Sequence, residues 1–273
     1  MQDIEKISPK IDVVFKALFA KKGNEDLLED LIESIIERKV KCKEVIKEAR
    51  IGGRRPEEKY GALDIRVELE TGEEIDIEIQ LVDKKHTINR ALYYMSLLTT
   101  EDLNPSQTYA EMKQKIVIFI LDYKLFNYEE IVNESRICLE KHIEKEITKL
   151  HKYYFVELPN VEGITNKDMR RLKLWIAFLN QNKGELNMVK EDKIIKKAQE
   201  EYEYLTEDAE VKRLAWLREK AIRDELTMKE IGKEEGKQEG IKHVAKSLLD
   251  KAVSIDLIIS CTGLSKEEIE ELK

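Results

Sequence analysis

The sequence predicts an α/β domain, a mixed sheet flanked by helices, followed by a region that is entirely helical. Three patterns support this prediction. Apolar residues recur every three or four positions near the N-terminus, short alternating and continuous apolar runs follow between residues 43 and 158, and only helical periodicity remains after about residue 165. We expect an α/β domain over residues 1–162, a helical extension over 163–231 and a glycine-containing helical tail over 232–273.

The N-terminal half of the predicted domain contains helices and an extended hairpin. Residues 10–37 are predicted to form two amphipathic helices, because apolar residues recur at helical spacing on both sides of Gly23-Asn24. We expect a strand over residues 43–51. Residues 62–81 alternate apolar and polar side chains around a glycine, which predicts two antiparallel strands and a turn.

A helix and two strands complete the predicted sheet layer. Residues 84–100 are expected to be helical, with three apolar side chains facing inward. These are Leu92, Met95 and Leu98. The run KIVIFIL, residues 115–121, is continuously apolar, as in a strand that is buried on both faces. A last strand is expected over residues 153–158.

The C-terminal part carries only helical patterns. Residues 169–181 have one apolar stripe, whereas residues 190–240 are rich in Glu, Lys and Arg with few apolar positions. Exposed helices of this kind favour pairing with a partner chain, so we expect a homodimer through the C-terminal helices. The repeat GKEEGKQEG, residues 232–240, is expected to loosen or bend the helix. Two short helices are expected around CTGLS, with Ser265 and Glu268 forming a capping box.

Composition and charge argue against several classes of protein. The chain has 273 residues, 38% of them charged, and a net charge of −8, which argues against holding nucleic acid through a bulk positive field. Its three cysteines lie far apart and its four histidines form no pair at helical spacing, so we expect no zinc site. No apolar run approaches the roughly 18 residues of a membrane span. No N-terminal run resembles a signal peptide, so we expect a cytoplasmic protein that does not bind a membrane.

The hairpin over residues 62–81 has one register that matches apolar with apolar residues. A three-residue loop, Glu70-Thr71-Gly72, places glycine at the left-handed position of the common three-residue hairpin. In that register Asp64 lies directly across from Glu78. Their Cβ atoms are then expected to be about 4.5–5.5 Å apart, so the two carboxylates repel each other unless something neutralises them.

A proton, an arginine or a divalent cation could neutralise this pair. Arg66 lies on the same face, so a structural ion-pair cluster is one explanation, and it predicts that Arg66→Ala destabilises the fold. A hard cation such as Mg²⁺ is the other explanation, because it binds carboxylate oxygens, carbonyl oxygens and water. The backbone carbonyl of Ile79 is a natural additional ligand.

The order of short motifs along the chain resembles one family. Asp64 in LDI is followed fourteen residues later by Glu78 in EIQ, which looks like the core of the PD-(D/E)XK nucleases. Four further stretches, DVVFKALF, RALYYMSLL, YAEMKQKIVIFIL and EEGKQEG…TGLSKEEIEEL, resemble segments of the Rpn-type recombination-promoting nucleases, also called PD-(D/E)XK nuclease family transposases. This resemblance implies a restriction-endonuclease-like fold and a Mg²⁺-dependent DNA endonuclease, a hydrolase associated with recombination or transposable elements, with Mn²⁺ as a possible substitute.

The resemblance also implies roles for individual residues. Asp64 and Glu78 fall on the metal-binding acids. Gln80 falls on the position of the signature lysine, where it can orient a water molecule but supplies no positive charge. Asp12 falls on an acidic position of the first helix that often completes such sites, and Lys16 is one helical turn away on the same face.

Basic and aromatic side chains near these motifs are further candidates. Lys16 or Lys59 is a candidate contact for the scissile phosphate. Arg90 and Tyr94 are one turn apart on the helix after Gln80, and the resemblance implies that Arg90 contacts phosphate while Tyr94 supports a carboxylate or a base. The structural alternative is that Tyr94 packs on the sheet and Arg90 pairs with Asp or Glu.

Two other functions stay open from the sequence. A nuclease fold without turnover would act as a DNA-binding or assembly module, and Gln80 together with the acidic charge allows this. A structural α/β protein would use the hairpin acids only as an ion-pair cluster with Arg66. The CTGLS tail resembles half a helix-turn-helix, but its final helix is acidic, which favours packing or oligomerisation over DNA recognition.

Overall fold

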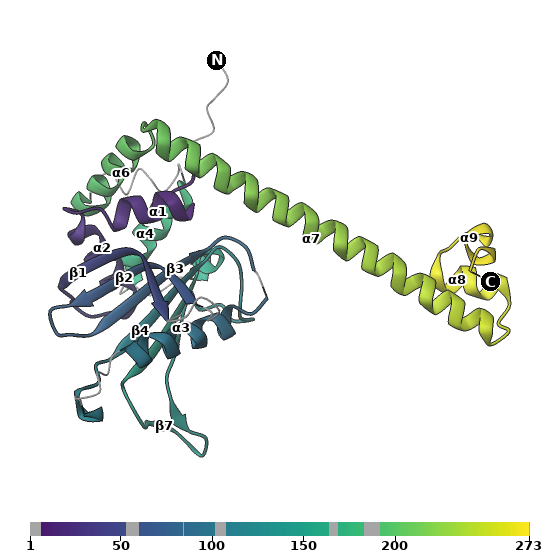
Figure 1. The fold of residues 1–273 in the computed structure, drawn as a ribbon, viewed down its shortest axis with the longest axis horizontal. Coiled ribbons are helices and arrows are strands. Elements are labelled where there is room, and N and C mark those ends of the chain that lie inside the picture. Colours follow the sequence, from purple (N-terminus) through teal and green to yellow (C-terminus); the bar gives the residue numbers. More distant parts are fainter. Residues whose placement is uncertain are drawn as a thin grey trace. The chain divides into compact units, whose positions relative to one another are not determined.

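A six-stranded mixed sheet with helices on both faces dominates the first part of the chain (Figure 1). The computed structural model describes residues 7–52, 60–83, 85–101, 108–163, 169–182 and 192–272. The chain divides into two compact units, Met1–Arg218 and Glu219–Lys273. Among the described residues, no helix combines the length and the apolar character that crossing a membrane requires.

The sheet has the strand order β1-β2-β3-β4-β8-β5. Its strands are β1 (Cys42–Gly52), β2 (Tyr60–Leu69), β3 (Glu74–Gln80), β4 (Lys115–Leu121), β5 (Val132–Ser135) and β8 (His151–Glu157). The first three strands are antiparallel neighbours, β4 is parallel to both β3 and β8, and β5 is antiparallel to β8. The mixed sheet and its predicted strands are therefore confirmed.

Three short strands were not predicted. They are β5 and the pair β6 (Cys138–Leu139) and β7 (His142–Glu146), which form a separate two-stranded sheet. Their sequences, such as VNES and HIEKE, are polar and mostly exposed, so they lack the apolar alternation that identifies a strand. By contrast, β4 is buried along its whole length, as its continuous apolar run predicts.

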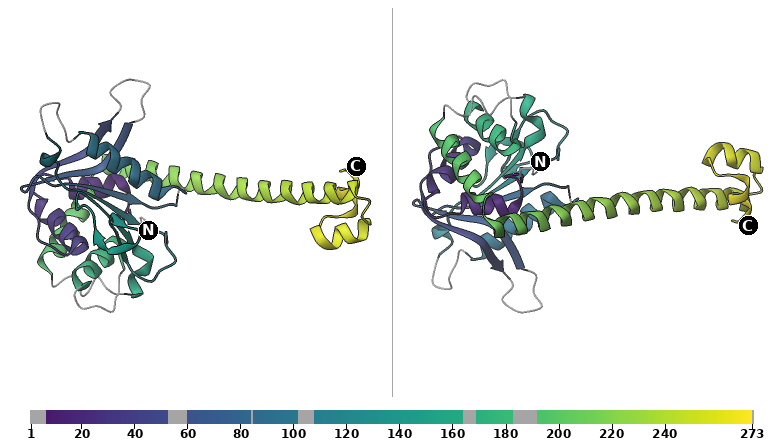
Figure 2. Two further views of the ribbon diagram at one scale, coloured as in Figure 1. Left: turned by 90° about the horizontal axis from the view of Figure 1, so that it is seen from below. Right: turned by 90° about the horizontal axis from the view of Figure 1, so that it is seen from above.

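Four helices of the first unit gather on one side of the sheet, and α3 (Thr87–Glu101) lies on the other side (Figures 1 and 2). The four are α1 (Asp12–Phe19), α2 (Glu25–Ile36), α4 (Arg170–Asn180) and α6 (Lys193–Leu205). The predicted break between α1 and α2 is confirmed, and Asn24 Nδ2 there donates to the Leu18 carbonyl at 2.9 Å. Trp175 of α4 is fully buried and packs on Phe19, with ring centroids 5.4 Å apart.

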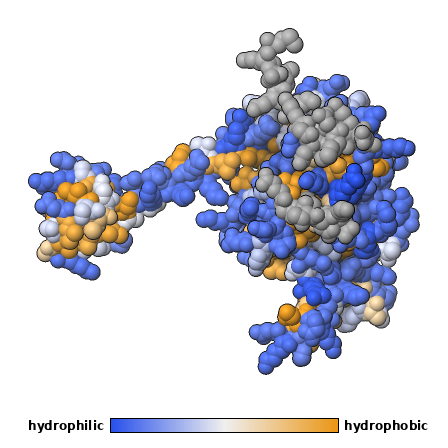
Figure 3. All heavy atoms as spheres, turned by 180° about the vertical axis from the view of Figure 1, so that it is seen from behind, coloured by the Kyte–Doolittle hydropathy of each residue, from blue (hydrophilic) through white to orange (hydrophobic). Residues whose placement is uncertain are grey.

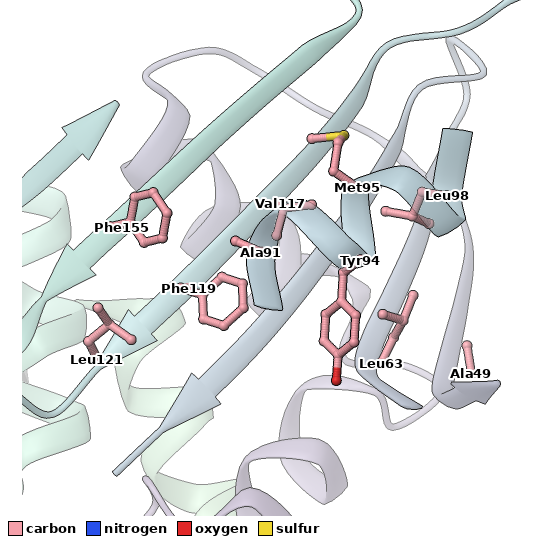
Figure 4. Close-up of a cluster of buried hydrophobic side chains, with 10 residues drawn as sticks. All are labelled: Ala49, Leu63, Ala91, Tyr94, Met95, Leu98, Val117, Phe119, Leu121 and Phe155. Carbon is pink, nitrogen blue, oxygen red and sulfur yellow. The ribbon is translucent and has the colours of Figure 1, made fainter. Parts of the chain in front are cut away.

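The helix α3 packs on the sheet through a stripe at helical spacing. Its buried side chains meet Val117 and Phe119 of β4 in one cluster (Figure 4). These side chains are Ala91, Tyr94, Met95 and Leu98. The prediction that Leu92 faces inward is wrong, because Leu92 is 51% exposed and lies one position away from this stripe.

The C-terminal region consists of α7 (Ala209–Asp250), α8 (Ile255–Thr262) and α9 (Lys266–Glu270). The bend expected at residues 232–240 is absent, because α7 continues through all three glycines. Each glycine costs about 1 kcal/mol of helix propensity, and the Glu, Lys and Gln residues between them are strong helix formers. The predicted capping box is confirmed, since Ser265 Oγ accepts the Glu268 N–H and Glu268 Oε2 accepts the Ser265 N–H.

The second unit has a small core of its own, and α7 has exposed apolar side chains. Four side chains are buried where the end of α7 meets α8 and α9. They are Ala245, Ile258, Leu264 and Ile269. Earlier along α7, the side chains of Trp216, Leu217, Met228 and Ile231 are exposed. The space-filling view shows hydrophobic residues along this helix (Figure 3). The homodimer through these helices stays a prediction.

Candidate active site

The hairpin of β2 and β3 has the register that its three-residue loop predicts. Ile65 pairs with Ile77, the offset that brings Asp64 opposite Glu78. Gly72 closes the loop with a φ of 81°, a left-handed conformation that glycine adopts without a steric penalty. Alternation along the two strands and one glycine therefore suffice to position the two acids.

Asp64 and Glu78 join the two strands where the described backbone ladder ends. Beyond the pair of Ile65 and Ile77, the Asp64 N–H donates to Glu78 Oε1 at 2.9 Å. The Ile79 N–H donates to Asp64 Oδ2 at 3.2 Å. Each carboxylate thus accepts a main-chain hydrogen bond from the opposite strand, so both carboxylates lie in the space between β2 and β3.

Burial makes this space costly for two negative charges. Glu78 is fully buried, and the Asp64 side chain is 14% exposed. Burial raises the pKa of Glu78 well above its ordinary value, and the nearby Asp76 and Asp64 raise it further. Burial also raises the pKa of Asp64, although Lys16 opposes the effect. A cation between the strands would relieve this cost.

Two basic side chains now supply positive charge to the acids. Arg90 Nη2 of α3 donates to Glu78 Oε2 at 2.7 Å, and Lys16 Nζ of α1 lies 3.5 Å from Asp64 Oδ1. Gln80 connects Glu78 with Arg90. Its Nε2 donates to Glu78 Oε2 at 3.3 Å, and its Oε1 accepts from Arg90 Nη1 at 3.3 Å. The structure therefore brings together five of the predicted site residues, which are Lys16, Asp64, Glu78, Gln80 and Arg90.

Tyr94 supports Arg90 from the hydrophobic cluster under α3. Its ring lies among the cluster side chains (Figure 4), and its hydroxyl accepts a hydrogen bond from Arg90 Nε at 2.9 Å. Burial raises the pKa of Tyr94 to about 12, with a further contribution from Glu78. In this arrangement Tyr94 packs on the sheet and Arg90 pairs with Glu78, as the structural alternative expected, and both stand beside the candidate site.

Asp12 reaches the site only indirectly. Its Oδ2 forms a 3.0 Å ion pair with Arg218 Nε at the start of α7, and its Oδ1 accepts the Val13 N–H at 2.9 Å. Asp12 is nevertheless close enough to Asp64 to raise the pKa of that carboxyl. Lys59, the other candidate for a phosphate contact, lies outside the described residues.

Asp76 is an acid of the site to which the sequence analysis assigned no role. It is fully buried on β3, two residues before Glu78, and neither of its carboxylate oxygens has a hydrogen-bond partner among the described residues. Burial raises its pKa well above the ordinary value, and Asp64 raises it further. The alternation in the run IDIEIQ already places residues 76, 78 and 80 on the polar side of the strand, facing the same space as Asp64, although no separate role followed for Asp76.

Arg66 does not neutralise the Asp64–Glu78 pair. Its guanidinium lies 2.6 Å from Glu74 Oε2 and 3.0 Å from Glu101 Oε2. The arginine on Glu78 is Arg90 of α3 instead, so the ion-pair cluster with Arg66 that was one explanation of the hairpin acids is not what the structure shows.

Arg66→Ala is therefore expected to lower stability without changing the candidate site. Glu74 keeps its ion pair with Lys115 Nζ at 2.7 Å, so we expect a loss of only about 1–2 kcal/mol. Urea denaturation would measure this loss. A defect in the site itself, seen as an equal loss of any activity that Asp64→Asn removes, would show that Arg66 does serve the two acids.

The oxygen donors between β2 and β3 suit a hard divalent cation. Mg²⁺ is commonly held by one or two carboxylates, while waters and substrate phosphates complete its shell. Asp64 and Glu78 are such a pair. Across the residues that the structure describes, no group of three or more His, Cys, Asp or Glu side chains is arranged to hold a metal ion.

Comparison with known proteins gives a family match. Residues 9–232, most of the chain, match a family described as PD-(D/E)XK nuclease family transposase. The matched range includes every strand of the six-stranded sheet, α3 and both acids between β2 and β3. Neither the curated proteins nor the solved structures give a match.

Proposed function

The chain belongs to the PD-(D/E)XK nuclease family transposases, and from that premise we propose that it is a metal-dependent DNA endonuclease that acts in recombination or at transposable elements. The observation that carries the proposal is the reciprocal pairing of Asp64 and Glu78 between β2 and β3. Two buried acids with raised pKa values are costly in a merely structural hairpin, whereas a cation site requires them.

The metal ligands in this proposal are Asp64, Glu78 and the backbone carbonyl of Ile79, and the metal is Mg²⁺ or, as a substitute, Mn²⁺. A divalent cation bound there would lower the pKa of a water molecule and neutralise charge on the phosphate. The protein contributes the position of the two carboxylates, which main-chain hydrogen bonds already fix.

The neighbouring polar side chains have complementary roles. Gln80 orients the attacking water, because its amide is held by Glu78 and Arg90 on the same side of β3. Arg90, which pairs with Glu78 Oε2 and donates to Gln80 Oε1, would contact the substrate phosphate beside the two acids. Lys16 approaches the phosphate from the α1 side, next to Asp64.

The proposed partners are DNA and a second copy of the chain. The net charge of −8 requires that DNA contacts be local, and Lys16 and Arg90 supply such contacts at the site. The exposed apolar residues of α7, among them Trp216 and Met228, support a homodimer through the C-terminal helices.

Plasmid cleavage with different metals tests the proposed function. We expect nicking or linearisation of supercoiled DNA with Mg²⁺ and with Mn²⁺, little with Ca²⁺, and none with EDTA. Asp64→Asn protein in the same buffers controls for contaminating nucleases. Equal cutting by the two proteins, or cutting that EDTA does not stop, would contradict the proposal.

A nuclease fold without turnover is the second candidate function. The ion pairs of Glu78 with Arg90 and of Asp64 with Lys16 favour this second function, because the two basic side chains already neutralise the acids. It predicts that Mg²⁺ titration gives no heat, that DNA remains intact, and that DNA migration is retarded in a gel.

A further inference from the structure

Glu48 on β1 has a backbone conformation that an ordinary strand residue does not adopt. Its φ is 54°, in the left-handed region that is uncommon for residues other than glycine. The β1–β2 ladder is regular on both sides of Glu48, but the pair with Asp64 is missing from it. The strained position therefore lies opposite one of the two acids between β2 and β3.

This conformation brings the Glu48 carboxylate to Lys16. Glu48 Oε1 lies 3.0 Å from Lys16 Nζ, and the same nitrogen lies 3.5 Å from Asp64 Oδ1. The Lys16 side chain is only 10% exposed, whereas that of Glu48 is 62% exposed. Lys16 thus reaches the site from α1, with a carboxylate on either side of its ammonium group.

Stability alone does not explain the strained residue. An ion pair with one largely exposed partner contributes little to folding, so a strained backbone is a poor way to gain it. Strained non-glycine residues instead gather at functional sites, and irregular strand positions lie next to active sites. The strained residue here is the one whose carboxylate contacts the Lys16 ammonium on the side away from Asp64.

We propose that Glu48 is a positioning residue, which holds the ammonium group of Lys16 beside Asp64 so that α1 supplies the positive charge that Gln80 does not provide. This inference rests on the proposed nuclease function.

Kinetics of Glu48→Gln test the role in cleavage. The substitution keeps the size of the side chain and removes its charge, so we expect kcat to fall about tenfold with little change in KM. Glu44→Gln, which removes an exposed carboxylate from the same strand, is the matched control and should cleave like the wild type. The double variant Glu48→Gln/Lys16→Met should cleave no more slowly than Lys16→Met alone, because Glu48 acts only through Lys16 and the two substitutions remove the same function.

Glu48→Gly separates the charge from the strain. Glycine adopts the left-handed conformation freely, so this variant should melt at the same temperature as Glu48→Gln or higher, and yet lose the same cleavage. Wild-type kinetics in both variants, or an additive effect with Lys16→Met, would overturn the proposal.

Chemical labelling of Lys16 gives a readout that does not depend on cleavage. Acetylation by acetic anhydride, followed by mass spectrometry, should be several-fold faster at Lys16 in Glu48→Gln than in the wild type, and unchanged in Glu44→Gln. Unchanged labelling of Lys16 in Glu48→Gln would overturn the positioning role. If the wild type cleaves no DNA, the proposed function fails, and the labelling still decides whether Glu48 holds Lys16.

Discussion

Asp64→Asn and Glu78→Gln are each expected to lower metal-dependent cleavage of plasmid DNA by about a thousandfold. Each change removes one of the two carboxylates that would hold the cation, and the charge stabilisation from a bound metal amounts to several kcal/mol. The side-chain carbonyl of each amide can still accept the main-chain hydrogen bond, from Ile79 in one case and from Asp64 in the other. The loss of cleavage is therefore expected without a loss of the strand arrangement.

Thermal melting in EDTA distinguishes this result from unfolding. Burial raises the pKa of both acids, so the amide variants remove a charge that is costly to bury, while they also lose the ion pairs with Arg90 or Lys16. Because these effects oppose each other, we expect each variant to unfold in one cooperative transition, as the wild type does. Glu68→Gln on β2, which removes a carboxylate paired with Lys43, is the control and should keep its activity. Unchanged nicking by both Asp64→Asn and Glu78→Gln would discard the assignment of the two acids.

The arrangement of the two acids could be predicted because it depends on local rules. Apolar alternation fixes which residues face each other, and Gly72 fixes the loop, so the register of Asp64 and Glu78 follows from about twenty residues of sequence. The continuous apolar run of β4 is equally local, since a short run of β-branched and aromatic residues is typical of a strand covered on both faces.

The remaining features of the site depend on contacts between distant segments. Glu48 has no sequence signal, because nothing in the residues around it predicts a left-handed φ, and its contact with Lys16 joins β1 to a helix that precedes it in the chain. The sequence offered Arg66 as the partner of the two acids and left Arg90 to pair with an unspecified Asp or Glu, and only the position of α3 shows that Arg90 is the partner of Glu78. In the same way, the inward stripe of α3 is displaced by one position from Leu92, because it depends on how the helix is rotated on the sheet.

Asp76→Asn is expected to stabilise the protein, by an amount that grows as the pH rises. Asp76 is fully buried, with no hydrogen-bond partner for its carboxylate oxygens among the described residues, and burial raises its pKa well above the ordinary value. The directly opposite Arg66 directs its guanidinium to Glu74 and Glu101. Folding must therefore either protonate Asp76 or bury its charge, and an amide avoids both costs.

The direction of this pH dependence follows from the number of protons that the folded and unfolded states bind. Between the unfolded pKa of aspartate, about 3.9, and the raised folded pKa, the folded protein holds a proton that the unfolded chain has lost. Stability from this group therefore falls as the pH rises through that window, by about 1.4 kcal/mol per pH unit. The amide that Asp76→Asn introduces cannot titrate. The difference in free energy of unfolding between the variant and the wild type should therefore grow by up to about 1.4 kcal/mol for each pH unit.

Urea denaturation in EDTA at pH 5, 6, 7 and 8 measures the difference between the two proteins. Asp224→Asn, which removes an exposed carboxylate from α7, controls for the change in net charge and should give a difference that does not depend on pH. A constant difference for Asp76→Asn would mean that Asp76 is ionised in the folded protein throughout this range, which requires a cation close to its carboxylate. In that case Asp76 would act together with Asp64 and Glu78 as one of the acids that bind a cation between the strands.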